Sequence, residues 1–322
     1  MGSGARPDSG EGDNRMNTAT TFRHDALLYA GLDDFVKRTA GFVREGLVAD
    51  EAVAVAVIQP RAGALREELA ADAAHVTWID MERVGRNPAR IIPAWAQWTQ
   101  EQGTRVFRGI GEPIWAGRDD AELVECRHHE TLLNLAFDGV PWQLLCPYDT
   151  TTLDAGTIDA VRHSHPQVLH GAARIDHPHP EPDHFAATLL GPALPPAPDH
   201  AEHLAFRSGE LAGVRALVRR VLSDVARAQT NHALLAISEI AGNSVAHGGG
   251  AGTISLWRQD SYLVCEIRDA GRVVDPLAGR HRPTPDQDGG RGLWIANQIC
   301  DLVQIRSTET GTVVRLRVDV AS

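Results

Sequence analysis

The sequence predicts an α/β protein with two domains, and three observations support this prediction. Between residues 22 and 175, predicted helices alternate with short apolar strands. From residue 204 onward, the predicted order is helix, helix, strand, strand, loop, helix, strand, strand. Residues 176–203 are dense in proline, which removes hydrogen-bond donors and disfavours helix. We therefore expect a semi-rigid linker at 176–203 between domains at 22–175 and 204–322, preceded by a disordered start at 1–21.

The first domain is expected to contain a mostly parallel sheet. Residues 51–58 form a near-continuous run of alanine and valine, as expected for a strand buried on both faces. The repeated strand–helix order predicts helices on both sides of that sheet, which makes a three-layer domain. The other expected strands are 76–80, 105–110 and 142–147, and the expected helices are 33–45, 88–100, 119–136 and 154–164.

The second domain is expected to be an α/β sandwich. Apolar residues from Leu211 to Leu222 recur at helical spacing. A second helix is expected at about 230–246, and a third at 293–300. With strands at 252–259, 261–269, 303–308 and 311–318, this order predicts helices on one face of a mostly antiparallel sheet.

Composition excludes several classes of function. The chain has 322 residues and a formal net charge of −11, with no basic stripe, so nucleic-acid binding is not expected. No apolar run reaches membrane-spanning length, and a cytoplasmic location follows by default. Lys37 is the only lysine, and it lies in no Gly-Lys-Ser motif, so a phosphate-binding P-loop is excluded. The cysteines are scattered and are expected to be small buried hydrophobic residues: Cys126, Cys146, Cys265 and Cys300.

Polar residues in the second domain suggest a nucleotide site. Glu239, Asn243 and His247 are four residues apart and would share one helix face. A carboxylate and a carboxamide one turn apart can hold a hydrated divalent cation and polarise a hydroxyl group. Asp269 can accept a hydrogen bond from an exocyclic amine, and the glycine-rich turns at 269–271 and 289–293 let backbone N–H groups approach phosphates. His247 also suits the negative end of a helix, which is its simpler interpretation.

This constellation resembles the Bergerat-type ATPases, a superfamily that includes histidine-kinase catalytic domains and anti-sigma-factor serine kinases. The stretch around Glu239 is similar to the N-box, Asp269-Ala-Gly271 to the first glycine box, and Gly290-Arg291-Gly292 to the second. The resemblance implies ATP and Mg²⁺ as cofactors, with Asn243 as the Mg²⁺ ligand, Glu239 as the general base or the residue that orients it, and Asp269 bound to the adenine amine. It further implies nucleotide contacts from Asn243, His247, Asp269, Gly271, Gly290, Arg291, Gly292 and Leu293.

The loop at 275–289 has the position of the ATP lid in that family, although an ordinary exposed loop would have the same composition. Its short length resembles the anti-sigma kinases more than the larger ATPases. Two departures from the family pattern stand out. Gly242 occupies a helix interior, and no further glycine of the first box follows Gly271.

The first domain resembles the MEDS sensory domain, on the segments 22–29, 109–115 and 145–149. The resemblance implies a RecA- or KaiC-like core and a sensing role. After the first alanine-valine strand, the segment 59–62 lacks phosphate-loop chemistry, so ATP hydrolysis is not expected there. Polar residues near the strand ends could form a small-molecule or metal pocket or a satisfied polar network: His24, Glu112, Trp115, Glu125, His128, His129 and Tyr148.

A run of histidines is better explained by the composition of the linker than by metal binding. The run contains His163, His165, His170, His177, His179 and His184.

The leading functional hypothesis is an anti-sigma regulatory factor with ATP-dependent serine kinase activity, controlled by the sensory domain. Its expected partners are a sigma factor and a small STAS-type antagonist protein, and a homodimer is compatible with this hypothesis. A sensor histidine kinase is the second alternative, but the helical hairpin that bears the acceptor histidine is missing before Glu239. A non-catalytic ATP-binding scaffold is the third alternative, and the two departures from the family pattern keep it open.

Overall fold

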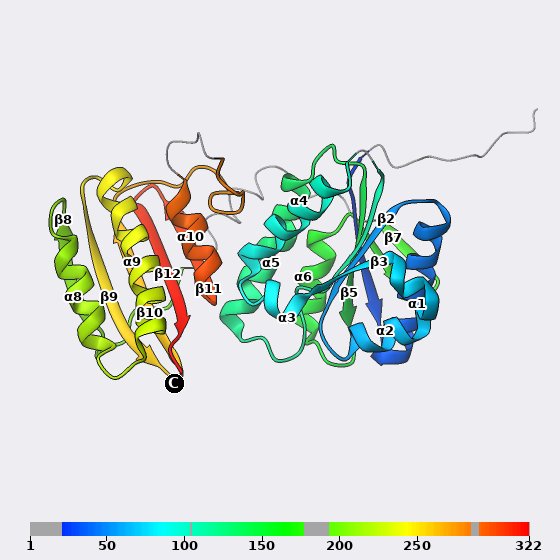
Figure 1. Cartoon of the computed structure of the whole chain (residues 1–322), viewed down its shortest axis with the longest axis horizontal. Coiled ribbons are helices and arrows are strands. Elements are labelled where there is room, and N and C mark those ends of the chain that lie inside the picture. Colours follow the sequence, from blue (N-terminus) through cyan, green and yellow to red (C-terminus); the bar gives the residue numbers. More distant parts are fainter. Residues whose placement is uncertain (1–20, 104, 177–192, 285–289, 322) are drawn as a thin grey trace, which may run out of the picture.

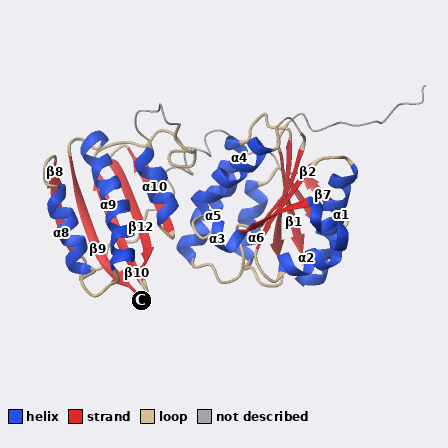
Figure 2. Cartoon of the chain, viewed as in Figure 1, coloured by secondary structure: helices blue, strands red, loops and turns tan. Residues whose placement is uncertain are grey.

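The computed structural model describes residues 21–103, 105–176, 193–284 and 290–321, which form two α/β domains on separate sheets (Figures 1 and 2). The expected fold class is confirmed for both domains. Some expectations lie outside the described residues, namely those for 1–20, 177–192 and 285–289, which belong to the expected disordered start, linker and lid.

The first domain is built on a seven-stranded sheet with the order β3-β2-β4-β5-β1-β6-β7. All neighbouring strands run parallel except the terminal β6–β7 pair. The strands are β1 (Arg23–Tyr29), β2 (Ala52–Val57), β3 (Val76–Asp80), β4 (Phe107–Gly111), β5 (Trp142–Asp149), β6 (Gln167–His170) and β7 (Ala173–Asp176).

Helices cover both faces of this sheet, so the domain has three layers (Figure 2). One apolar core lies under α1 (Gly31–Val48) and α2 (Arg61–Leu69), and it includes alternate residues of β2 such as Val53 and Val55. The other core includes Trp95, Trp142 and the remaining β2 residues. This second core lies under α4 (Ile91–Glu101), α5 (Asp120–Ala136) and α6 (Ala155–Ser164). Three shorter helices lie in the connections of the domain: η1 (Ala70–His75), α3 (Met81–Val84) and η2 (Pro88–Arg90).

Helix α5 has a well-defined start, which matters because it faces the second domain. The Asp119 side chain accepts a hydrogen bond from the Glu122 backbone N–H at 2.9 Å, and Glu122 accepts one from the Asp119 N–H at 3.1 Å. This reciprocal capping box satisfies two N–H groups that would otherwise lack partners. The first turn of α5 is therefore fixed in place, with acidic side chains directed outward.

The second domain is built on an antiparallel five-stranded sheet with the order β11-β12-β10-β9-β8. Alternate residues of its strands face an apolar core under three helices, which lie side by side in Figure 1. The strands are β8 (Glu202–Arg207), β9 (Ala251–Gln259), β10 (Tyr262–Asp269), β11 (Leu302–Thr308) and β12 (Gly311–Asp319), and the helices are α8 (Leu211–Val221), α9 (Arg227–His247) and α10 (Arg291–Ile299).

The expected elements appear close to their expected positions, but several were missed. Strands β1, β6, β7 and β8 and helix α2 were not expected. Strand β8 is an edge strand whose residues are mostly exposed, so it lacks the apolar alternation that identifies a strand. It begins at Glu202, inside the expected linker, so the linker expectation is too long at this end. Among the described residues, no helix combines the length and apolar character needed to cross a membrane.

Candidate nucleotide site and domain interface

Helix α9 carries the three polar residues that the sequence singled out. Glu239, Asn243 and His247 occur at successive turns along its C-terminal half, so they share one face. Glu239 and Asn243 are half-buried, whereas His247 is the exposed last residue of the helix. The polar face of α9 is therefore exposed to solvent at His247 and partly covered at Asn243 and Glu239.

Asp269 lies at the end of β10, directly beside the C-terminal end of α9. The Ser244 hydroxyl donates a hydrogen bond to Asp269 Oδ2 at 2.6 Å, and the Gly271 backbone N–H donates to Oδ1 at 2.8 Å. Ser244 is buried and adjoins Asn243 in sequence, so this contact fixes Asp269 relative to the polar face of α9. Each carboxylate oxygen has a further lone pair, so the group can still accept a hydrogen bond from a ligand amine.

The glycines between α9 and the first turn permit a close backbone approach. A Cβ on Gly248 would lie 2.5 Å from Asp269 Cγ, and one on Gly271 would lie 2.6 Å from the His247 carbonyl oxygen. No side chain fits at these distances without displacing the backbone or the carboxylate. Glycine is therefore required at both positions for α9 and the turn at 269–271 to meet as they do.

The second glycine turn lies against Asn243. Gly290 has a φ of +77° and precedes α10, a left-handed conformation that favours glycine. A Cβ on Gly292 would lie 2.7 Å from Asn243 Nδ2, so Asn243 occupies the space that a side chain at 292 would need. Leu293 packs on the apolar core, while Gly290 and Arg291 are exposed at the start of α10.

The structure thus brings most of the expected site residues to one end of the second domain. Contacts or near contacts connect Asn243, His247, Asp269, Gly271 and Gly292. Glu239 lies one turn before Asn243 on the same helix face. Sequence analysis missed the hydroxyl groups that support the first turn, although Ser244 directly follows Asn243. These hydroxyl groups belong to Ser244, Ser307 and Thr312. Ser244 donates to Asp269, Ser307 accepts a hydrogen bond from the Val273 N–H, and Thr312 donates to the Gly271 carbonyl.

The far end of α10 is held by the first domain. Arg90 donates hydrogen bonds to the carbonyl oxygens of Asn297, at 2.8 Å, and Cys300, at 2.7 Å. The buried Asn87 side chain donates to the same two carbonyls, at 3.1 and 3.4 Å. The last carbonyls of a helix lack partners within the helix and carry partial negative charge. The first domain therefore supplies the C-terminal cap of the helix whose other end forms the second glycine turn.

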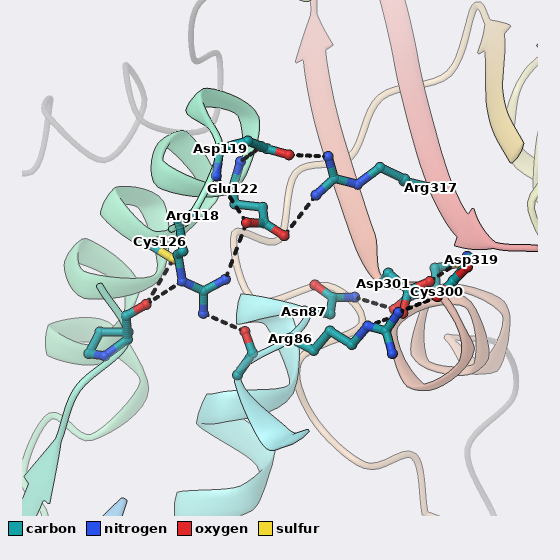
Figure 3. Close-up of polar contacts among 12 residues, drawn as sticks. Arg86, Asn87, Arg118, Asp119, Glu122, Cys126, Cys300, Asp301, Arg317 and Asp319 are labelled. Carbon is teal, nitrogen blue, oxygen red and sulfur yellow. Dashed lines mark hydrogen bonds and ion pairs between the residues drawn. The ribbon is translucent and has the colours of Figure 1, made fainter. Parts of the chain in front are cut away.

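The outer face of the second sheet rests on α5, and Figure 3 shows part of this interface. Arg306 of β11 donates to Glu125 at 2.8 Å, and both side chains are about 95% buried or more. Arg317 of β12 pairs with Glu122 at 2.8 Å and with Asp119. Burial alone would raise the pKa of Glu125, but His128 and Arg306 bring it below its ordinary value. Glu125 is therefore ionised at neutral pH.

The first half of the expected lid also contacts the first domain. Leu277 packs against the apolar core that includes α5. Arg280 is buried and interacts electrostatically with the Glu125 carboxylate. The Asn297 side chain of α10 donates a hydrogen bond to the Gly279 carbonyl at 2.9 Å. A cavity of about 50 Å³ remains between Glu125, His128 and the loop residues. Residues 275–280 thus lie between α5 and α10.

The polar residues singled out in the first domain do not form one cluster. Glu112 lies at the end of β4 with Tyr29 and Arg61. Glu125 and His128 pair with each other on α5 next to the second domain. His24 and Tyr148 face Glu130 and His165 between the sheet and α5. These residues therefore do not cluster together near the strand ends, because the strands and α5 present their side chains in different directions.

The two sheets, the polar helix α9 and the paired glycine turns define a two-domain α/β protein whose second domain has the framework of a nucleotide-binding fold. Residues 23–166 match the family model of the MEDS (methanogen/methylotroph, DcmR sensory) domain, and residues 204–318 match that of the histidine kinase-like ATPase domain. The chain therefore combines a MEDS sensory domain with a histidine kinase-like ATPase domain.

The other comparisons add little. The comparison with curated proteins gives no match. Among solved structures, the RsbU and RsbW domains of Rv1364c from Mycobacterium tuberculosis align at 20% identity with a TM-score of 0.30. That alignment covers 39% of this chain and 34% of that chain, so this chain spans about a third of its length.

Proposed function

We propose that this protein is an anti-sigma-type regulator whose ATPase domain binds Mg-ATP and phosphorylates a serine of a small STAS-type antagonist. In its other state, the same domain would hold a sigma factor, and the MEDS domain would bias the choice between the two partners. The observation that carries this proposal is the convergence of Asn243, Asp269 and Gly292 at one end of the second domain. The match to the histidine kinase-like ATPase family supports it.

The residues present suit a magnesium nucleotide. Gly248 and Gly271 keep side chains away from the Asp269 carboxylate. The first N–H groups of α10, which follow Gly290, have no acceptor within their own helix. Turns of this kind accommodate anionic groups through backbone N–H donors. Asn243 offers a carboxamide oxygen, a hard ligand of the kind that Mg²⁺ accepts. Nothing in this set of donors favours a softer metal.

Each residue has a defined role in this proposal. Asn243 would hold Mg²⁺, which neutralises phosphate charge when it is bound. Asp269, oriented by Ser244, would accept a hydrogen bond from the adenine amine. Glu239, one helical turn from Asn243, would orient or deprotonate the serine hydroxyl of the partner. Positioning and charge neutralisation contribute most of the rate enhancement in reactions of this class.

The interface offers a physical route for control by the MEDS domain. Arg90 and Asn87 hold one end of α10, and Gly292 at the other end lies against Asn243. Leu277 and Arg280 of the lid segment rest on the first domain. A shift of the first domain relative to the second sheet would therefore move both α10 and the segment 275–280, which border the proposed nucleotide site.

A non-catalytic scaffold is the second candidate, and Gly242 favours it. This residue lies inside α9 between Glu239 and Asn243, and nothing lies within 4 Å of the position of its missing Cβ. Glycine in a helix interior costs about 1 kcal/mol relative to alanine. The turn that separates the proposed base from the proposed metal ligand is therefore less rigid than it could be, which affects catalysis more than binding.

Replacing Asn243 with alanine is expected to weaken Mg-ATP binding by the full-length chain by at least about 100-fold, because a direct metal ligand is lost. Isothermal titration calorimetry measures this change. The matched control is Asn231→Ala, an exposed asparagine near the start of the same helix, which should bind like the wild type. Equal affinity in Asn243→Ala and the wild type would remove Asn243 from the site.

The partners can be tested in the same preparation. A pull-down from the native cytoplasm, with and without ATP, should recover a sigma subunit or a small antagonist protein, identified by mass spectrometry. Recovery of a response regulator in their place would favour a histidine-kinase pathway and contradict the proposed partners. Nucleotide binding without any phosphate transfer to the recovered antagonist would favour the scaffold.

A further inference from the structure

Four buried side chains converge between the first sheet and its α5–α6 helix layer, and the proposed function uses none of them. His24 comes from β1, Glu130 from α5, Cys146 from β5 and His165 from the residue after α6; we call these four the tetrad. Each is 1% exposed. One ligand-type atom from each lies within 4.8 Å of the other three. Four elements thus direct nitrogen, oxygen and sulfur atoms to one point without access to water.

Strand geometry explains why His24 and Cys146 meet. The two strands are parallel neighbours, with His24 opposite Leu144 and Cys146 opposite Ala26. Side chains two residues apart on a strand share a face, so His24 and Cys146 lie on the same face, toward α5. His24 Nε2 is 3.3 Å from Cys146 Sγ. Glu130, on α5, faces them from the opposite layer, with Oε2 3.0 Å from His24 Nε2.

The outer nitrogen of each imidazole has a fixed hydrogen-bond acceptor. His165 Nδ1 lies 2.9 Å from the Val161 carbonyl, which can only accept. His24 Nδ1 lies 3.1 Å from Asn134 Oδ1. The Asn134 amide group donates to the Ser164 carbonyl at 3.1 Å, which confirms that its oxygen faces His24. Both Nδ1 atoms therefore carry hydrogen, and in the neutral form of each ring the Nε2 lone pair points into the tetrad.

More hydrogen-bond acceptors than hydrogen-bond donors point toward the centre of the tetrad. Glu130 Oε2 lies 3.0 Å from His24 Nε2 and 3.4 Å from His165 Nε2, but it has no hydrogen bond of acceptable geometry among the described residues. Two nitrogen lone pairs and a carboxylate oxygen repel one another when they are buried together, and an unsatisfied buried charge is costly. A cation at the centre removes that repulsion. The Tyr148 hydroxyl donates to the other oxygen, Oε1, at 2.6 Å and so aims Oε2 at the centre.

The spacing fits a tetrahedral transition metal. Zinc bonds of about 2.0–2.1 Å to nitrogen and 2.3 Å to sulfur put ligand atoms roughly 3.3–3.7 Å apart at the tetrahedral angle. The separations of 3.0, 3.3 and 3.4 Å between ligand atoms in the tetrad are close to this range. A thiolate and two imidazoles favour zinc-class ions over Mg²⁺ or Ca²⁺. The contacts from Asn134, Val161 and Tyr148 are those that orient metal ligands in known sites.

We propose that His24, Glu130, Cys146 and His165 bind one divalent transition-metal ion of the zinc class in a closed four-ligand site. Binding releases the Cys146 thiol proton to solvent, and no oxidation or reduction is involved. The ion connects β1, β5, α5 and the end of α6. Because α5 also carries Glu122 and Glu125, which pair with Arg317 and Arg306 of the ATPase domain, occupancy of this site would fix the helix on which that domain rests.

The wild-type chain provides the first test, independent of any variant. Full-length protein, stripped with a chelator and then offered Zn²⁺, should retain roughly one equivalent after dialysis and should melt at a higher temperature than the stripped form. Offered Co²⁺, it should show the intense visible bands of a tetrahedral site and a thiolate-to-cobalt charge-transfer band in the near ultraviolet. The absence of tight uptake and of the charge-transfer band would overturn the proposal.

Variants then locate the site. Cys146→Ser should lose the charge-transfer band and most of the bound metal, whereas Cys265→Ser, at a buried cysteine of the second sheet, should keep both. Asn134→Ala removes only an orienting contact and should weaken Zn²⁺ binding by about 10- to 100-fold while the fold is retained. Unchanged zinc affinity in folded Cys146→Ser or Asn134→Ala protein would place any bound metal elsewhere, for example on surface histidines.

Discussion

Replacing Glu239 with alanine is expected to reduce phosphate transfer to the antagonist serine by about 10²- to 10⁴-fold, the usual contribution of a positioned general base. Mg-ATP binding should persist, because Asn243 and Asp269 hold the nucleotide in our proposal. The geometry supports this separation of roles. Glu239 lies one turn before Asn243 on α9, and Asp269 is fixed by Ser244 and Gly271 without help from Glu239.

Transfer of radiolabelled phosphate to the recovered antagonist, with calorimetry on the same samples, measures both quantities. The control is Glu309→Ala, an exposed glutamate in the β11–β12 turn, which should transfer phosphate at the wild-type rate. A Glu239→Ala protein that transfers phosphate as fast as the wild type would show that another group activates the serine. Loss of ATP binding in that variant would instead assign Glu239 to the binding of the nucleotide.

Replacing Arg306 with alanine should destabilise the contact between the domains by about 3 kcal/mol, because it leaves the buried Glu125 carboxylate without its closest ion-pair partner. The remaining contacts of Glu125 with Gln304, at 3.4 Å, and His128, at 3.5 Å, place this figure at the low end of the usual range. Arg317→Ala is the matched control, since its partners Asp119 and Glu122 are more exposed and its loss should cost about 1 kcal/mol or less.

The cost of Arg306→Ala should depend on pH in a defined direction. The folded-state pKa of Glu125 lies below its ordinary value, so its contribution to stability is present above the pKa of an unfolded glutamate and is lost as pH falls through the folded value. Without Arg306 the folded-state pKa should rise, and the deficit should be larger at neutral pH than at about pH 4. Urea unfolding at both pH values measures it. A deficit that is equal at both values would mean that packing, not charge, holds this contact.

The parts of the fold that could be predicted from the sequence are those with a strong local signal. The alanine-valine run of β2 and the apolar spacing of α8 each identify an element without knowledge of its neighbours. The spacing of Glu239 and Asn243, with the glycine turns that follow, identified one end of the second domain because these residues are close in sequence and their geometry is helical. Ser244 was missed because a serine inside a helix has no distinctive pattern until its partner Asp269 is known.

The interface and the tetrad depend on contacts between distant residues, so no local pattern indicates them. Arg306 and Glu125 are separated by 181 positions, and each taken alone resembles an ordinary surface charge. His165 falls in a run of histidines that was attributed to linker composition, yet it is buried at the end of α6 against Glu130. Cys146 is buried as expected, but its neighbours are ligand-type atoms as well as apolar side chains.

Photolabelling tests the central claim of a nucleotide site on α9 most directly, because the chain has two α/β domains and either fold could accept a nucleotide. The full-length protein is irradiated with 8-azido-ATP and Mg²⁺, cleaved after arginine and analysed by mass spectrometry. We expect the label within residues 228–258 or 269–272, which contain Asn243 and Asp269, and its loss with excess ATP. Label confined to the first domain, for example around Arg61 at the start of α2, would contradict the account.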